Sequence, residues 1–83
     1  MYTVIVEKSA QKKLYKLQAK ERGRIAEKLK GLEGDPRPPG CKKLTNRENY
    51  RIRVGDYRVI YNINDNILTV LVIDIDHRKQ VYE

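Results

Sequence analysis

Residues 50–63 read Tyr-Arg-Ile-Arg-Val-Gly-Asp-Tyr-Arg-Val-Ile-Tyr-Asn-Ile, and this stretch decides the fold class. Apolar residues alternate with mostly basic ones on both sides of Gly55 and Asp56, which is typical of half-buried β-strands. The Gly-Asp pair has the length and composition of a two-residue hairpin turn. The stretch therefore predicts a β-hairpin with its apolar side chains on one face and its arginines on the other.

The arginines of this hairpin are expected to crowd together. A two-residue turn pairs Arg53 with Arg58 and brings Arg51 to the same face. Like charges that face each other on a sheet are destabilising by about 0.2–1 kcal/mol. The pattern therefore favours an anion that binds between them. In the alternative interpretation the three side chains spread into solvent or pair with Asp74 or Asp76.

The N-terminal part of the chain is predicted to form a strand and a helical hairpin. Tyr2–Val6 is short and β-branched, and Ser9 after it is a good N-cap for a helix. Apolar residues then recur at helical spacing over 10–17 and again over about 21–32. Gly23 and a loss of phase before it indicate a break between the two helices.

The remaining segments complete an α+β domain. Residues 33–47 contain three prolines and two glycines and predict a loop, and residues 64–66 predict a turn. The apolar run 67–73 predicts a central strand that is covered on both faces. The expected order is β-α-α-β-β-β in a single domain of residues 1–83, with a mainly antiparallel sheet and the N-terminal helical hairpin packed on one face.

The charge of the chain is concentrated in two blocks. The net charge of the 83 residues is +7. Residues 1–33 carry nine basic and four acidic side chains, and residues 37–58 carry seven and two, whereas residues 59–83 are net negative. Such an excess suggests a polyanionic partner, with solubility alone as the simpler explanation. The second block is rich in arginine, whose planar fork fits phosphate.

Several classes of protein are excluded by composition. A single cysteine, Cys41, excludes a disulfide framework and a cysteine-based zinc site, and the single histidine, His77, weakens other metal sites. Asp74 and Asp76 are spaced for one strand face, but no third ligand accompanies them. We therefore expect no metal and no cofactor. Residues 1–7 do not resemble a signal peptide and no apolar run is long enough to span a bilayer, so the expected location is the cytoplasm.

Three segments of the chain resemble the RelE/ParE superfamily of type II toxins. They are residues 35–44, which contain Asp-Pro-Arg-Pro-Pro-Gly and Lys-Leu, the hairpin 50–61, and Asp-His-Arg-Lys-Gln-Val-Tyr at 76–82. The likeness extends over nearly the whole chain. It implies a small sheet-and-helix toxin that a cognate antitoxin neutralises. The RelE branch cleaves mRNA in the ribosomal A site, and the ParE branch poisons DNA gyrase.

The resemblance also implies a set of site residues. The RelE-type catalytic positions fall on Arg51, Arg53, Arg58, Arg78 and Tyr82, with His77 as a further candidate. Basic residues expected to contact RNA phosphates are Arg37, Lys42, Lys43 and Arg47. The sequence differs from the best-known bacterial member of the family in two ways. The spacing from Arg78 to Tyr82 is shorter in this chain, and that member has lysines at the positions of Arg51 and Arg53.

That last difference leaves the general base open. Cleavage by the 2′-hydroxyl needs a base, an acid and charge stabilisation, but it needs no metal. Arg51 and Arg53 can clamp a phosphate, yet arginine cannot lose its proton in a protein. The remaining candidates for the base are Tyr82, which could instead stack on a nucleobase, and His77, because histidine is a common general base.

The resemblance implies three possible functions. The favoured function is that of a ribosome-dependent endoribonuclease. Its expected partners are a cognate antitoxin, mRNA and ribosomal 16S rRNA. The complex of toxin and antitoxin is expected to be hetero-oligomeric. The first alternative is a non-catalytic ParE-type toxin that binds DNA gyrase, in which the arginines are ordinary surface charges. A third is an inactive relative that serves mainly as an antitoxin partner. No membrane partner is expected.

Overall fold

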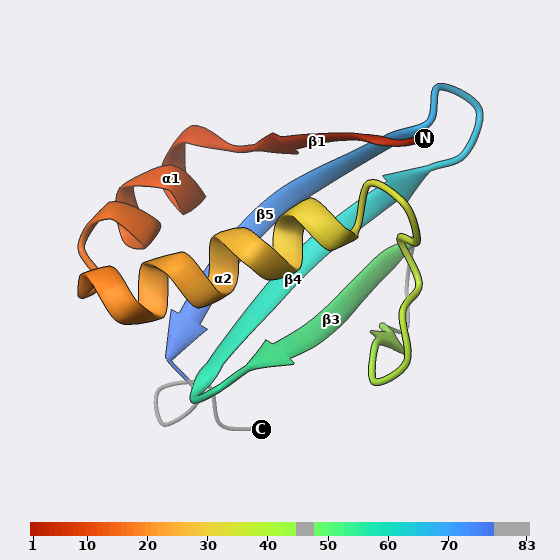
Figure 1. The fold of residues 1–83 in the computed structure, drawn as a ribbon. Coiled ribbons are helices and arrows are strands. Elements are labelled where there is room, and N and C mark those ends of the chain that lie inside the picture. Colours follow the sequence, from red (N-terminus) through yellow and green to blue (C-terminus); the bar gives the residue numbers. More distant parts are fainter. Residues whose placement is uncertain (45–47, 78–83) are drawn as a thin grey trace.

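A mixed five-stranded sheet with two helices on one face makes up the computed structural model, which describes residues 1–44 and 48–77 (Figure 1). The sheet order is β1-β5-β4-β3-β2, with β1 parallel to β5 and the other neighbours antiparallel. The predicted fold class is confirmed. The elements are β1 (Thr3–Val6), α1 (Lys8–Tyr15), α2 (Ala19–Gly31), β2 (Lys42–Lys43), β3 (Asn49–Val54), β4 (Tyr57–Asn64) and β5 (Thr69–His77).

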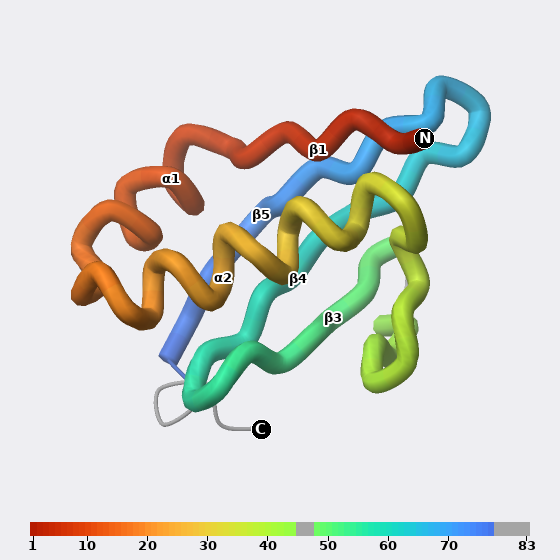
Figure 2. Tube along the Cα trace, in the orientation of Figure 1, coloured from red at the N-terminus to blue at the C-terminus, as the bar shows by residue number. Residues whose placement is uncertain are grey.

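The helical hairpin lies across one face of the sheet and closes the core (Figure 2). Ile25 and Leu29 of α2 are buried, as are Ile52 on β3 and Val59 and Tyr61 on β4. The helix side chains lie on the apolar face of α2, and the strand side chains lie at alternate positions of β3 and β4. The helical period and the strand period therefore turn these residues towards one common core. The opposite face of the sheet is left without a helix among the described residues.

β5 is central, as predicted, but its bounds and its surroundings differ from the prediction. Ile67 and Leu68 lie in the preceding turn with exposed side chains, and Leu68 has a φ of 49°. The Asn64 Oδ1 accepts the backbone N–H groups of residues 66 and 67 and so holds this turn. Leu71 and Ile73 are only half-buried. The prediction that both faces are covered was wrong, because both helices pack on the same side.

The helix boundaries correct two local predictions. The N-cap of α1 is Glu7, whose backbone carbonyl accepts the N–H of Gln11, and Ser9 lies inside the helix. Gly23 lies inside α2, which begins at Ala19, and the break between the helices falls before it. In both cases a residue with weak helix propensity is tolerated because the apolar face is packed on the sheet. No helix in the described residues is long and apolar enough to cross a membrane.

A short strand lies where the sequence predicts only a loop. Lys42 is paired with Arg51 and Lys43 with Tyr50, so that β2 extends the sheet beyond β3. The loop before it is tied to the core by the Tyr61 hydroxyl, which donates to the carbonyl oxygen of Pro36 at 2.8 Å. Prolines do not prevent this pairing because all three precede the strand.

Candidate active site

Four cationic side chains lie together on one face of the sheet, which we call the arginine face: Lys42, Arg51, Arg53 and Arg58. Arg53 is the direct partner of Arg58 across the hairpin, which confirms the predicted register. Arg51 is the direct partner of Lys42 on β2. Directly opposed residues point to the same side of a sheet, as do residues two apart on one strand. The arginine face therefore consists of two adjacent rows of like charge.

The arginine face is the side of the sheet that the helices leave open. Ile52, which lies between Arg51 and Arg53 on β3, points the other way and is only 2% exposed. Lys42 and Arg53 are exposed, whereas Arg51 is half-buried. No described carboxylate forms an ion pair with any of these three cations. An anion that binds here would relieve their repulsion.

Two aspartates lie at the border of the arginine face. Ile60 is paired with Asp74 and Arg58 with Asp76, because Ile73 is an extra residue that bulges out of the β5 ladder. Without this bulge the alternation of β5 would turn both carboxylates towards the core. No group of three or more potential metal-ligating side chains occurs in the parts of the chain that the structure describes.

Lys13 on α1 binds both of these carboxylates. Its Nζ is 2.8 Å from Oδ1 of Asp74 and 2.7 Å from Oδ1 of Asp76. The hydrogen bonds to Asp74 and then to Asp76 raise the pKa of Lys13. Burial raises the pKa of Asp74, but its hydrogen bonds with Asp76 and Lys13 outweigh burial and lower the net pKa. The acidic pair thus has a counter-ion that comes from a helix.

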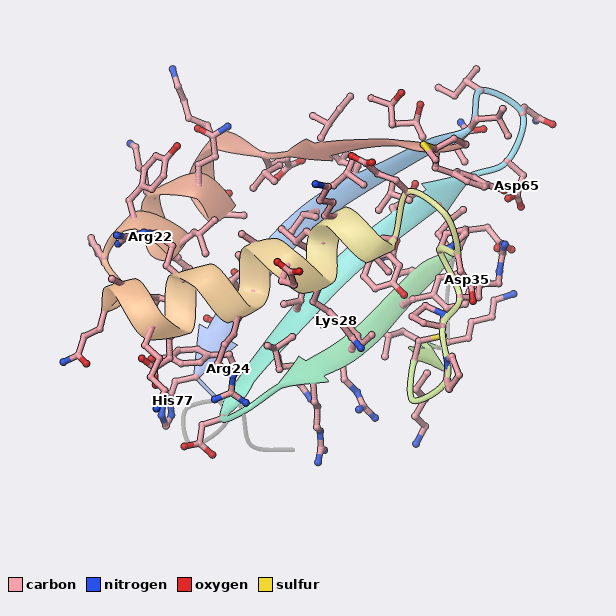
Figure 3. All side chains as sticks on the ribbon, viewed as in Figure 1. Arg22, Arg24, Lys28, Asp35, Asp65 and His77 are labelled. Atoms are coloured by element: carbon pink, nitrogen blue, oxygen red, sulfur yellow. The ribbon has the colours of Figure 1, made fainter. Side chains whose placement is uncertain are left out.

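His77 points away from the arginine face. It is the direct partner of Tyr57, and the two rings meet edge to face with centroids 5.0 Å apart. Both rings line a groove of about 410 Å³ beside α1, together with Lys13, Lys16 and Leu17. Figure 3 places His77 at the end of β5, near the hairpin turn. The structure therefore does not bring this candidate base among the arginines.

Arg37 belongs to a polar clasp at the other end of β4, which we define as Tyr2, Arg37, Glu48, Tyr50 and Asp65. The Arg37 Nε donates to the Tyr50 hydroxyl at 2.9 Å, and its Nη2 is 3.0 Å from Asp65 Oδ2. The Asp65 hydrogen bond is the main cause of a raised Arg37 pKa. The Tyr2 hydroxyl donates to Asp65 at 2.5 Å. The clasp therefore joins the N-terminus, the proline-rich loop, β3 and the β4–β5 turn.

Other predicted site residues are not part of the arginine face either. The Nζ of Lys43 is 3.2 Å from Oε2 of Glu48, so Lys43 forms an ion pair with a member of the polar clasp. Among the described residues that were predicted to contact RNA phosphates, only Lys42 lies on the arginine face. Arg47, Arg78 and Tyr82 lie outside the described residues.

Asp65 gives the polar clasp a testable pH dependence. Hydrogen bonds from Arg37 and then Tyr2 lower the pKa of Asp65. A carboxyl group with a lowered pKa in the folded state stabilises the fold above its unfolded pKa, and this contribution is lost as the pH falls through the folded pKa. We expect the melting temperature of the wild type to decrease when the pH is lowered below about 4. The decrease should be less steep in Asp65→Asn. Melting curves from pH 7 to 2 check this, with Asp56→Asn as the control. Identical pH profiles in both variants would contradict it.

Comparison with known proteins decides the family. A family model described as the ParE toxin of the type II toxin–antitoxin system parDE matches residues 4–82. Toxin RelG of Mycobacterium tuberculosis is 33% identical over 85 residues, which cover 98% of this chain and 95% of RelG. The chain belongs to the RelE/ParE toxin superfamily. The resemblance seen in the sequence is confirmed.

Solved structures place this RelE/ParE chain close to RelE proteins. The archaeal RelE–RelB complex from Pyrococcus horikoshii OT3 matches with a TM-score of 0.87 and 30% identity, over 96% of this chain and 98% of that chain. The intact Escherichia coli RelBE toxin–antitoxin complex matches with a TM-score of 0.83 and 25% identity, over 93% and 96%. The arginine face is therefore carried by a RelE-like fold.

Two contributors to the site of this RelE/ParE toxin are not apparent in its sequence. The sequence around Lys13 predicts only a solvent-exposed helix face. The residues next to it in the chain do not indicate that α1 packs beside β5, where Asp74 and Asp76 lie. The pairing of Lys42 with Arg51 escapes detection because a two-residue strand has no periodicity. The basic pair Lys42–Lys43 is the available signal, and it does not indicate which of the two lysines faces the arginines.

Proposed function

We propose that this chain is an mRNA endoribonuclease, the toxin of a type II toxin–antitoxin pair that cleaves mRNA in the ribosomal A site. One observation carries the proposal. Arg53 faces Arg58 on an open sheet face, next to Lys42 and Arg51. Like charges that lie directly opposite each other on a sheet repel, and a phosphodiester, which fits the arginine fork, would relieve that repulsion.

The proposed reaction assigns the arginine face to charge stabilisation. The 2′-oxygen attacks the adjacent phosphorus, its proton passes to a base, and the bond to the 5′-oxygen breaks as that oxygen gains a proton. The products are a 2′,3′-cyclic phosphate and a 5′-hydroxyl. Arg53 and Arg58 bind the non-bridging oxygens, where negative charge develops in the transition state. Tyr82 is the first candidate for the base or for a stacking platform, and His77, which faces the other side of the sheet, is the second.

A cognate antitoxin is the proposed protein partner. The related structures from Pyrococcus horikoshii and Escherichia coli are RelE proteins in complex with RelB. By analogy, this chain forms a hetero-oligomeric complex in which the antitoxin blocks access to the ribosome. Carboxylates of the antitoxin that approach the arginine face would speed association more than they add affinity.

Primer extension on an mRNA that is being translated tests this function. The purified chain is added to a reconstituted translation system, and an equal amount is added to the same mRNA without ribosomes. We expect cuts at A-site codons in the first sample and far fewer in the second. Absence of ribosome-dependent cuts with a folded protein would contradict the proposal.

A gyrase inhibitor is the second candidate, because the matching family model is described as a ParE toxin. In that case the chain acts by binding protein, and the arginine face has no catalytic role. A DNA-cleavage assay with purified gyrase separates the two functions. Accumulation of cleaved DNA, without cuts in translated mRNA, would establish the second candidate in place of the first.

Lys13→Met is expected to weaken the binding of single-stranded RNA to the arginine face by about three- to tenfold. The change removes one positive charge and leaves Asp74 and Asp76 without their counter-ion beside Arg58. Fluorescence anisotropy with a 2′-O-methyl oligonucleotide measures the affinity without cleavage.

A double-mutant cycle shows whether Lys13 acts through the acidic pair. In an Asp74→Asn/Asp76→Asn background, Lys13→Met should change the affinity by less than about twofold, because no carboxylates remain to be neutralised. An equal loss in both backgrounds would mean that Lys13 contacts the RNA itself.

A further inference from the structure

The outer side of β1 is an open sheet edge. β1 is the first strand in the sheet order and, among the described residues, it pairs only with β5 (Figure 1). Natural proteins protect an exposed edge with charged side chains, with proline or with a very short strand. The opposite edge is protected in this way, because β2 consists of Lys42 and Lys43 alone. Thr3–Val6 has no charge and no proline, and all four residues are β-branched. β1 is therefore the edge that a further strand can extend.

The backbone of β1 shows which groups face this open edge. Thr3 and Glu7 donate their N–H groups inward, to the segment of β5 and the residue before it. The backbone groups of successive residues alternate in direction along a strand. The N–H and C=O groups of Tyr2, Val4 and Val6 therefore face outward.

Two of these outward groups already have partners. The Tyr2 N–H donates to the backbone carbonyl of Glu33 at 2.8 Å, and the Val6 carbonyl accepts the Nε2 of Gln11 at 3.2 Å. No other described protein group bonds the N–H and C=O of Val4, the N–H of Val6 or the C=O of Tyr2. The open edge therefore offers two donors and two acceptors.

These four groups are complementary to the same four groups of a second copy. When two β1 strands pair antiparallel about a two-fold axis at Val4, each Val4 N–H meets the Val4 carbonyl of the other copy, and each Val6 N–H meets a Tyr2 carbonyl. The Tyr2 N–H and the Val6 carbonyl, which already have partners, then face each other. A register shifted by two residues would place an open Val4 group opposite one that is already bound. Self-pairing at Val4 thus satisfies every open group and keeps the existing bonds.

The side chains of β1 fit the same contact. In this register Ile5, which is 49% exposed on the open face of the sheet, lies beside Thr3 of the other copy and is covered by it. On the helix side, Val4 lies against its own counterpart. Val4 also lines an apolar groove of about 290 Å³ together with Leu14 and Leu29, so the paired valines extend a surface that is already apolar.

The position of β1 keeps the arginine faces of two copies apart. Arg58 lies on β4, which is separated from β1 by β5. Five strand spacings of about 4.8 Å, or about 24 Å in all, then lie between the two copies of β4. This distance exceeds the Debye length of about 8 Å at physiological ionic strength. The two arginine faces therefore repel each other only weakly, and both stay open.

We propose that the β1 edge is a self-association surface, through which two copies of this chain form a symmetric dimer with one continuous ten-stranded sheet. The inference is independent of the proposed function, because it rests on β1 and not on the arginine face. Small interfaces are typical of weak and transient complexes. We therefore expect a dimer that dissociates on dilution.

Sedimentation velocity of the purified chain over a wide range of concentrations tests the proposal. Ile5→Lys places like charges diagonally across the two-fold axis and should weaken the dimer by about tenfold or more. Ile67→Lys is the control. It has the same change in charge on a side chain that is 66% exposed, but it lies in the turn on the β5 side of β1. We expect it to dimerise within about twofold of the wild type. Melting curves establish that both variants are folded.

Disulfide trapping tests the register. In a Cys41→Ser background, Thr3→Cys and Ile5→Cys are made as separate proteins and oxidised with glutathione disulfide, alone and mixed. The register pairs residue 3 with residue 5 of the other copy at a Cα separation of about 4.5 Å, which a disulfide can bridge. We expect the mixture to cross-link at least about fivefold more than either protein alone.

The inference would be overturned by a chain that stays monomeric at every concentration, by equal loss of the dimer in Ile5→Lys and Ile67→Lys, or by equal cross-linking of the mixture and the single variants. A monomeric chain whose binding to its antitoxin is weakened by Ile5→Lys alone would assign the edge to the antitoxin instead. If the dimer forms as expected but translated mRNA is not cut, the proposed nuclease function is wrong and the inference stands.

Discussion

Arg58→Ala is expected to lower the rate of ribosome-dependent mRNA cleavage by about two to three orders of magnitude, the loss typical of removing one preorganised donor to a developing oxyanion. Arg58 lies in the middle of the arginine face, opposite Arg53 on one side and Asp76 on the other. It is half-buried, which places its charge where water screens it less than at an exposed position. Single-turnover primer extension with saturating ribosomes measures the chemical step.

Two further variants make the Arg58 result specific. Arg58→Lys keeps the charge but loses the planar fork, so its rate should lie between those of the wild type and Arg58→Ala. Lys30→Ala removes a cation from α2 outside the arginine face and should leave the rate within about twofold. A folded Arg58→Ala protein that cleaves at the wild-type rate would exclude the arginine face as the catalytic surface.

Tyr61→Ala is expected to lower the free energy of unfolding by about 3–5 kcal/mol, which is the usual loss for a large buried aromatic residue. Tyr61 is 0% exposed and lies on the central part of β4. Its ring stacks on that of Tyr50 with centroids 5.9 Å apart. The substitution removes this stack and the bond to Pro36 in one step. Urea denaturation followed by circular dichroism gives the free energy.

The hydroxyl group of Tyr61 can be tested separately from its ring. Burial raises the pKa of Tyr61, so the group remains a proton donor at neutral pH. Tyr61→Phe leaves the buried carbonyl of Pro36 without this donor, which costs about 1–3 kcal/mol. Tyr15→Phe is the control, because Tyr15 is 69% exposed. Equal stability of Tyr61→Phe and the wild type would mean that this hydrogen bond does not anchor the proline-rich loop.

The hairpin shows how far local sequence predicts the site. Alternation along 50–63 assigns each side chain to a face, and the two-residue turn at Gly55 and Asp56 sets the pairing. These two rules are enough to place Arg53 and Arg58 opposite each other, and the observed register agrees. Both rules act over a few neighbouring residues, so the pairing within the hairpin does not depend on where distant segments pack.

The face of Asp74 and Asp76 could not be predicted in the same way. One bulged residue, Ile73, moves every later side chain of β5 to the other face. The bulge depends on how β5 fits against β4 and α1 together. Periodicity cannot reveal it, because the run 67–73 is apolar at nearly every position.

By itself the sequence determined the fold class, the order of every helix and strand except the short strand β2, the hairpin register and the face shared by Arg51, Arg53 and Arg58. The tertiary structure alone decided that Lys42 completes that face, that Lys13 binds Asp74 and Asp76, and that Arg24 of α2 lies against the hairpin turn at Gly55. The physical reason is the range of the interactions. A strand period and a tight turn are set by neighbours in the chain, whereas these three contacts join segments whose distance apart depends on how the helices and the sheet bury one common core.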